Sequence, residues 1–183
     1  GFETHLVEYA EHVLPPLEVE MAALVTQELR ALGVCVHAGV AAQSVTHGDD
    51  QDCVTLSDGT VLSADVIVLS TGVRPDTAFA EAAGIETKHG YILVDEHGRT
   101  SVDGIYAVGD ATMGRDHDRP VALAGPVNRG GRLVADAIAD AEHCEATARP
   151  IPSPQGTAIV RIGGLTAAMT GANRQALDAS GAE

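Results

Sequence analysis

The 183-residue chain has no tryptophan, and aromatic residues make up only 3% of it. Unpaired nucleic-acid bases stack on aromatic side chains, so this scarcity argues against a single-stranded nucleic acid as a partner. Positive charge is scarce too, because 26 acidic residues outnumber 11 Lys and Arg and give a net charge of −15. Such a surface repels nucleic-acid phosphates and anionic lipids. We therefore expect neither a nucleic-acid partner nor a membrane partner.

Long apolar runs and paired cysteines are also lacking. No run approaches the ~20 apolar residues of a membrane-spanning helix, and no segment has the pattern of a secretory signal. The cysteines Cys35, Cys53 and Cys144 are odd in number, far apart and in no C-x-x-C pair. They predict neither a disulfide framework nor a structural zinc site, and they favour a reducing, cytoplasmic setting. We expect Cys35 to point into the core, Cys53 to start a strand, and neither to be reactive.

No metal site is expected from the remaining residues. The eight histidines show no H-x-x-x-H or H-x-H spacing. His117 lies between two aspartates, but adjacent residues rarely point at one ion, so a loop is the better interpretation. The acidic run at 49–52 has no glutamate at the twelfth position of a calcium loop.

The composition that remains is that of a globular protein, with 45% hydrophobic and 20% charged residues. The first segment predicts a strand at 4–8, a helix that starts at Pro15 and Pro16, and a strand that starts at Val34. Gly33 is the expected cap at the C-terminal end of this helix. The order strand, helix, strand is that of a βαβ unit.

A meander of short strands should follow, with a tight turn at Asp58-Gly59. The run Val66–Leu69 is continuous, apolar and rich in β-branched residues, which predicts a parallel strand buried on both faces. The later pattern predicts further elements at these positions: helix 77–83, strands 91–94 and 105–108, a charged loop at 114–120, helix 126–139, a proline-rich linker at 149–155, strands 157–162 and 165–170, and a helix from Arg174.

The segment Ile105–Ala111, Ile-Tyr-Ala-Val-Gly-Asp-Ala, is the most specific signal in the chain. A strand that ends in Gly109-Asp110 lets a ligand approach the backbone closely, and the carboxylate can accept hydrogen bonds from sugar or ribityl hydroxyls. An ordinary turn after a strand is the alternative.

Many short pieces, spread in order along nearly the whole chain, match the pattern of one family. They are Leu6-Val7-Glu8, Val13 to Leu17, Leu56 to Thr60, Ser70 to Pro75, Val94-Asp95-Glu96, Arg99-Thr100-Ser101, Ile105 to Ala111, Leu123 to Pro126, Asn128-Arg129, Gly131-Arg132 and Gly156 to Val160. In their order and spacing the chain resembles the pyridine nucleotide-disulfide oxidoreductase family of flavoproteins. It is most similar to the branch of coenzyme A-disulfide reductases, NADH oxidases and NADH peroxidases.

The resemblance implies four FAD-binding residues in the second half of the chain. Asp110 would bind the ribityl and pyrophosphate region of FAD. Ala122, Leu123 and Ala124 would lie against the isoalloxazine ring, at the start of the next helix. A helix N-terminus favours negative charge, which suits a reduced flavin. Core positions at a helix start are the alternative for Leu123 and Ala124.

The resemblance also implies two NADH-binding residues. Glu8 ends a strand, where an acid can accept both ribose hydroxyls of adenosine and repels a 2′-phosphate. Gly72 would let the nicotinamide half pass close to the backbone. NADH is therefore expected in preference to NADPH. A solvated acid at a strand end and a plain turn glycine are the alternatives.

The implied fold class is α/β, as part of a flavoprotein with two Rossmann-like domains. Residues 1–75 would be the C-terminal part of the NAD(P)-binding domain, and residues 76–148 the C-terminal part of the FAD-binding domain. Residues 149–183 would be a linker and the start of an α+β dimerisation domain. The complete protein would be a homodimer that acts on a small-molecule, thiol or disulfide substrate.

Two family features are missing from the sequence. It has no G-x-G-x-x-G fingerprint, which should lie about 20 residues before the strand-end acid, and no cysteine matches the family's redox position. We therefore expect an internal part of a larger enzyme, with the redox cysteine upstream and no catalytic residue here. The complete enzyme would pass hydride from NADH to flavin and electrons on to a disulfide, a peroxide or dioxygen. The chain alone is expected to be inactive and to bind FAD weakly or not at all.

Two other functions fit the missing features. One is a non-catalytic nucleotide-binding module or a degenerate remnant of such an enzyme. The other is a ferredoxin-type flavin reductase, which has no redox cysteine.

Overall fold

The computed structural model describes residues 1–117, 120–143 and 147–181. Residues 1–70 and 157–183 form one compact unit, and residues 71–156 form a second. The predicted domain boundary at 75/76 thus lies near the junction of the units. The domain assignments themselves stay predictions. No helix of the described residues combines the length and the apolar character needed to cross a bilayer.

The first unit opens with the expected βαβ arrangement. Strand β1 (Thr4–Glu8) pairs in parallel with β2 (Val34–Ala38), and helix α1 (Val19–Ala31) connects them. The helix begins after the two prolines rather than at them, because Glu18 is still extended and Leu17 closes a turn with Leu14. The βαβ prediction is confirmed, and the predicted helix start was wrong by a few residues.

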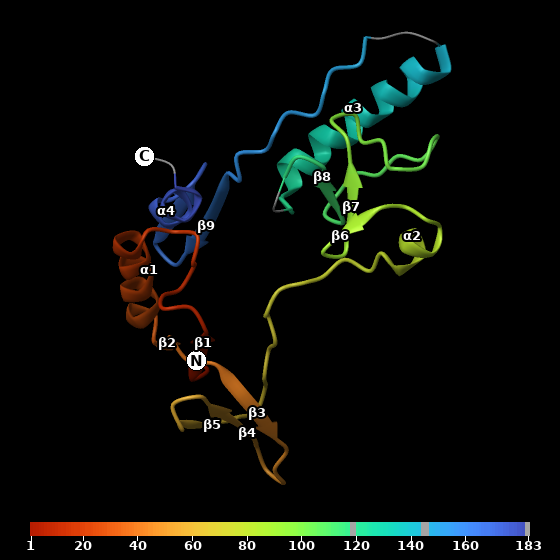
Figure 1. The fold of residues 1–183 in the computed structure, drawn as a ribbon. Helices are drawn as coiled ribbons and strands as arrows, with labels where there is room; N and C mark the ends of the chain where they lie inside the picture. The colour runs from red at the N-terminus through yellow and green to blue at the C-terminus, as the bar shows by residue number, and fades with distance from the viewer. Residues whose placement is uncertain (118–119, 144–146, 182–183) are drawn as a thin grey trace. The chain divides into compact units, whose positions relative to one another are not determined.

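The C-terminal segment belongs to this first unit. Strands β9 (Ala158–Ile162) and β10 (Leu165–Met169) form an antiparallel hairpin, and helix α4 (Arg174–Ser180) follows (Figure 1). Ala167 of β10 is buried in one core with α1 and the loop before it. The buried members of this core are Val13, Leu17, Ala22, Val25 and Ala167. Both strands, and a helix that starts at Arg174, are confirmed.

The expected meander is also present. Strands β3 (Ala42–Thr46), β4 (Asp52–Leu56) and β5 (Val61–Ala64) form an antiparallel sheet in that order. Cys53 is the second residue of β4, which agrees with its predicted place. Asp58 accepts a hydrogen bond from the backbone N–H of Thr60 at 2.9 Å, which closes the turn between β4 and β5.

Two further predictions for the first unit are wrong. Val66–Leu69 forms no strand, because no described strand forms backbone hydrogen bonds with this run. Its side chains Val66, Val68 and Leu69 are exposed. Cys35 is exposed rather than buried. Its neighbour Val36 packs on the core with Leu6, and successive side chains of a strand point to opposite faces. Cys144 lies outside the described residues.

The second unit joins a small sheet to a long helix. Strand β7 (Tyr91–Val94) pairs antiparallel with β6 (Thr87–Lys88) and parallel with β8 (Thr112–Gly114). Helix α2 (Ala78–Ala82) packs on the sheet through Ala80, which is fully buried with Ile92 and Val94. Helix α3 (Ala124–His143) buries one face. Its buried residues are Gly130, Leu133, Val134, Ala137 and Asp140.

Three predictions for this unit need correction. Residues 105–108 form no strand, because the chain folds back on 98–100 and only Arg99 and Tyr106 pair as a bridge. The strand lies further on, in β8, which ends at Gly114, the first residue of the predicted charged loop. Helix α3 is longer than 126–139. It begins at Ala124, where the carbonyl of Leu123 accepts the N–H of Val127.

Candidate functional site

The Gly109-Asp110 turn is held by its own backbone and by one hydroxyl. Thr112 donates from Oγ1 to the Gly109 carbonyl at 2.8 Å, and from its backbone N–H to the same oxygen at 3.1 Å. Gly109 has a φ of +116°, which side-chain-bearing residues rarely adopt. Asp110 is exposed, and its carboxylate makes no hydrogen bond or ion pair with another described residue. The turn therefore presents a free carboxylate acceptor.

The N-terminus of α3 presents free donors. The first helical hydrogen bond runs from Val127 to Leu123, so the N–H groups of Ala124 and Gly125 have no helical acceptor. Residue 126 is a proline and has no N–H to satisfy. Ala122 and Ala124 are exposed, and Leu123 is half-buried. The aligned peptide dipoles of α3 make this end attractive to a negatively charged group.

One cavity of about 820 Å³ brings these two segments together. Its wall includes Gly109 from the turn, and Val121 and Pro126 from either side of the α3 start. Asp110 and residues 122–124 do not line it and lie next to residues that do. The size is within the ~300–1,000 Å³ of pockets that hold small molecules and cofactors.

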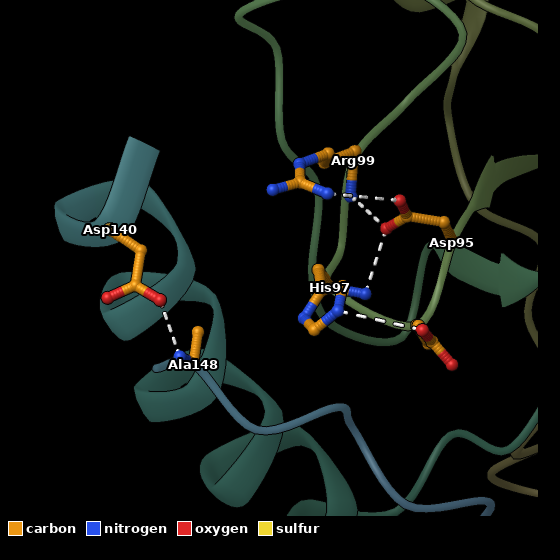
Figure 2. Close-up of polar contacts among 6 residues, drawn as sticks. Asp95, His97, Arg99, Asp140 and Ala148 are labelled. Atoms are coloured by element: carbon orange, nitrogen blue, oxygen red, sulfur yellow. Dashed lines mark hydrogen bonds and ion pairs between the residues drawn. The ribbon is translucent and has the colours of Figure 1, made fainter. Parts of the chain in front are cut away.

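A polar turn after β7 forms another part of the wall (Figure 2). Asp95 accepts hydrogen bonds from the N–H groups of His97 and Arg99, both at 2.8 Å. The hydrogen bond to Tyr106 is the main cause that raises the pKa of Arg99, and nearby Asp95 adds to it. His97 Nε2 lies 3.6 Å from Glu96, whereas its Nδ1 is buried and has no partner among the described residues.

The third wall is the proline-rich segment, which sequence analysis predicted only as a linker. Asp140, near the end of α3, is 9% exposed and accepts the N–H groups of Thr147 and Ala148. Figure 2 shows the hydrogen bond from Ala148. It also accepts the Thr147 hydroxyl at 2.8 Å. These hydrogen bonds, the one from Ala148 above all, lower the pKa of Asp140. The backbone N–H of Ile151 donates to the carbonyl of Glu96 at 2.7 Å. This hydrogen bond holds the proline-rich segment against the turn after β7, and both line the cavity.

Of the two residues proposed for NADH, Glu8 lies in the first unit. It is the last residue of β1, and its Oε1 accepts the N–H of Ala10 at 2.8 Å. Its backbone carbonyl accepts the N–H of Val40 at 3.2 Å. The acid thus lies at the carboxyl end of two parallel strands, where ligands bind in α/β sheets.

Gly72 lies at the start of the second unit. It is exposed, with a φ of +97°. The four FAD candidates and Gly72 therefore share the second unit, while Glu8 belongs to the first.

The sequence matches a known protein family. Residues 1–148 match the family described as "Pyridine nucleotide-disulphide oxidoreductase". A rubredoxin-NAD(+) reductase of Alcanivorax borkumensis is 40% identical over 141 residues, which cover 76% of this chain and 36% of that protein. A dihydrolipoyl dehydrogenase of Bacillus subtilis is 33% identical over 146 residues, which cover 76% of this chain and 30% of that protein.

Solved structures share the same fold. The reduced CoADR-RHD of Bacillus anthracis superposes with a TM-score of 0.90 at 32% identity, over 100% of this chain and 32% of that one. A NAD-dependent persulfide reductase from A. fulgidus gives a TM-score of 0.89 at 31% identity, over 98% of this chain and 33% of that one. The chain thus spans about a third of the length of the relatives that it matches.

Proposed function

The chain belongs to the pyridine nucleotide-disulphide oxidoreductase family, and from this premise we propose that it is part of an FAD-dependent enzyme that oxidises NADH. The family and the α/β fold expected from the sequence are confirmed. The observation that carries the proposal is that the residue before Asp110 and the residues on either side of the α3 start line one cavity.

The residues of the second unit suit FAD. No described residue bonds to the Asp110 carboxylate, whose oxygens can accept hydrogen bonds from the ribityl hydroxyls of FAD, and the open space at Gly109 allows close approach. The N–H groups at the start of α3 favour negative charge on the flavin, and the small side chains of Ala122 and Ala124 leave room for a flat ring. FAD, when bound, supplies the redox chemistry, from hydride acceptance to electron delivery.

Glu8 and Gly72 are proposed to bind NADH. The hydrogen bond from Ala10 orients the Glu8 carboxylate at the strand end, where its second oxygen can accept ribose hydroxyls. Negative charge there disfavours the 2′-phosphate of NADPH. We expect Glu8→Gln to reduce the preference for NADH over NADPH about tenfold in the complete enzyme, whereas Glu11→Gln, at an exposed position nearby, should not change it. An unchanged cofactor preference would exclude Glu8 from this role.

We propose a small disulfide, such as coenzyme A-disulfide, a peroxide or dioxygen as the electron acceptor. The likeness to a CoADR and to a persulfide reductase, each above 30% identity, supports the disulfide among these. A homodimer in a cytoplasmic setting, with dimerisation residues from 149–183, is proposed for the complete protein. The acidic surface and the unpaired cysteines support this location.

A small iron–sulfur redox protein is a second candidate acceptor. The relative with 40% identity is a rubredoxin-NAD(+) reductase, which favours the ferredoxin-type alternative. The two candidates separate in a turnover assay of the complete enzyme with NADH. Coenzyme A-disulfide as sole acceptor should support turnover under the first, and oxidised rubredoxin under the second.

The deciding experiment measures flavin bound per polypeptide in the complete protein and in two variants. We expect a yellow protein in which Asp110→Asn weakens FAD binding at least about tenfold, since a charged hydrogen-bond acceptor is lost. Asp136→Asn, at an exposed position of α3, is the matched control and should bind FAD normally. A colourless, folded protein would leave the non-catalytic module as the better account.

A further inference from the structure

We infer that Gly130, inside α3, is a positioning residue that sets the distance between Asp110 and the helix start. This inference rests on the proposed function, because it concerns how the two FAD-binding segments are held relative to each other. Gly130 lines the same cavity as Gly109 and Pro126. It acts through Val108, the residue directly before the Gly109-Asp110 turn.

An alanine side chain at position 130 would be in tight contact with Val108. A Cβ built on Gly130 would lie 3.2 Å from Val108 Cγ2, closer than the ~3.5–4.0 Å of relaxed carbon–carbon contact. Gly130 is buried. The absence of a Cβ therefore lets α3 approach the segment that carries the turn more closely than an alanine would allow.

A second close contact, one turn further along α3, also involves a glycine. Val134 lies over Gly98, where a built Cβ would meet Val134 Cγ2 at 2.5 Å and the Ala107 carbonyl at 3.2 Å. Residues 130 and 134 share one face of α3 because they are four apart. Two successive close contacts, Gly130 on Val108 and Val134 on Gly98, thus hold α3 against residues 98–108.

The two neighbouring glycines of α3, Gly130 and Gly131, differ in the space around them. Glycine weakens a helix interior relative to alanine, yet α3 has two in succession. A Cβ on Gly131 meets nothing within 4 Å. Gly131 therefore has space for alanine, whereas alanine at position 130 requires α3 or the Val108 side chain, which is 44% exposed, to shift by a few tenths of an ångström. A shift of α3 or of the Val108 backbone changes the separation of the Asp110 carboxylate from the donors at Ala124 and Gly125.

The test compares Gly130→Ala with Gly131→Ala and with a rescue variant. In the complete protein we expect Gly130→Ala to weaken FAD binding about tenfold and to shift the visible flavin spectrum, while Gly131→Ala does neither. Adding Val108→Ala to Gly130→Ala removes the clashing methyl groups and should restore binding to within about twofold of Val108→Ala alone. A purely structural role would lower the Tm without this rescue of the flavin spectrum.

A measurement without flavin keeps the inference separate from the proposed function. In the 183-residue chain, Gly130→Ala should move the amide NMR signals of Gly109 to Thr112, and Gly131→Ala should leave them in place. Equal effects of the two variants on these signals would overturn the inference even if the protein is yellow. A colourless complete protein in which only Gly130→Ala moves these signals would overturn the FAD proposal and leave the positioning role intact.

Discussion

Both units hold a returning segment of chain against a helix with carboxylates that accept backbone N–H groups, but they differ in burial. In the first unit Glu28 of α1 accepts the N–H of Gly164 at 2.8 Å, at an exposed contact. In the second unit Asp140 of α3 is 9% exposed and accepts two N–H groups and a hydroxyl. The hydrogen bonds from backbone N–H groups to a carboxylate are thus accessible to water in the first unit and shielded from it in the second.

Different interactions therefore attach the two segments. The hairpin β9–β10 buries Ala167 and packs Leu165 and Met169 on the core of the first unit, so hydrophobic burial dominates there. The segment 147–154 has no regular structure and depends on Asp140 and on the hydrogen bond from Ile151 to Glu96. We expect the first attachment to fail when its core is disturbed, and the second when a single carboxylate is changed.

The largest expected effect comes from a charge in the first core. Ala167→Asp places an unpaired carboxylate among buried side chains and should cost about 3 kcal/mol or more. Ala168→Asp, the next residue on the exposed face of β10, should change stability by less than about 0.5 kcal/mol. Urea unfolding of the 183-residue chain measures both. Equal losses from the two variants would show that β10 is not attached through Ala167.

The next effect tests the second unit. Asp140→Asn keeps the side-chain shape but removes the charge and one acceptor oxygen, so the amides of Thr147, Ala148 and Ile151 should lose protection from hydrogen exchange. The Tm of the second unit should fall by several degrees. Asp136→Asn, one turn earlier on the exposed side of α3, is the control. Unchanged protection in Asp140→Asn would mean that the segment is held by other contacts.

The pH dependence sharpens the comparison. Hydrogen bonds from Ala148 and Thr147 lower the pKa of Asp140 below its ordinary value of 3.8. A lowered pKa means that the ionised carboxylate contributes stability above this value and loses it as the pH falls through the folded pKa. The gap in stability between the wild-type chain and Asp140→Asn should therefore stay constant from pH 7 to about pH 5 and close below about pH 4.

The exposed turn of the first unit provides a comparison for this pH effect. Asp58 also has a lowered pKa, chiefly because of the N–H of Thr60. Asp58→Asn should show the same pH window with a smaller gap, since water competes for the exposed group. Acid titrations of unfolding, followed by circular dichroism, test both variants. If the stability difference between the wild-type chain and either Asn variant widens toward acid pH, the pKa of that aspartate is not lowered in the folded state.

The elements that sequence patterns predicted well are those stabilised by local features. The βαβ unit follows from helical spacing in α1 and from apolar strands on either side, and the turn at Asp58-Gly59 follows from its residue types. Val66–Leu69 and Ile105–Val108 have equally strong strand patterns and form no strand. A strand requires a partner in a ladder, and a local pattern carries no information about the partner.

The same limit applies to the candidate site. Asp110 and residues 122–124 were identified from their place in a family pattern, and the structure brings their neighbours to one cavity. Asp140 was missed because its partners are backbone N–H groups of residues 147 and 148, which any sequence would provide. Strand β8 was missed because Thr112–Gly114 has no apolar alternation and exists only through its pairing with β7.

The smallest expected effect is that of Glu28 in the first unit, which is half-buried and accepts an N–H at an exposed contact. Glu28→Gln keeps an acceptor for the N–H of Gly164 and loses only the charge, so it should cost less than about 1 kcal/mol. Glu20→Gln, exposed in the first turn of the same helix, is the matched control. Urea unfolding at low and at 0.5 M salt measures the difference, which should shrink with salt because an exposed charge is screened. A loss from Glu28→Gln as large as that from Asp140→Asn would mean that burial is not what separates the two attachments.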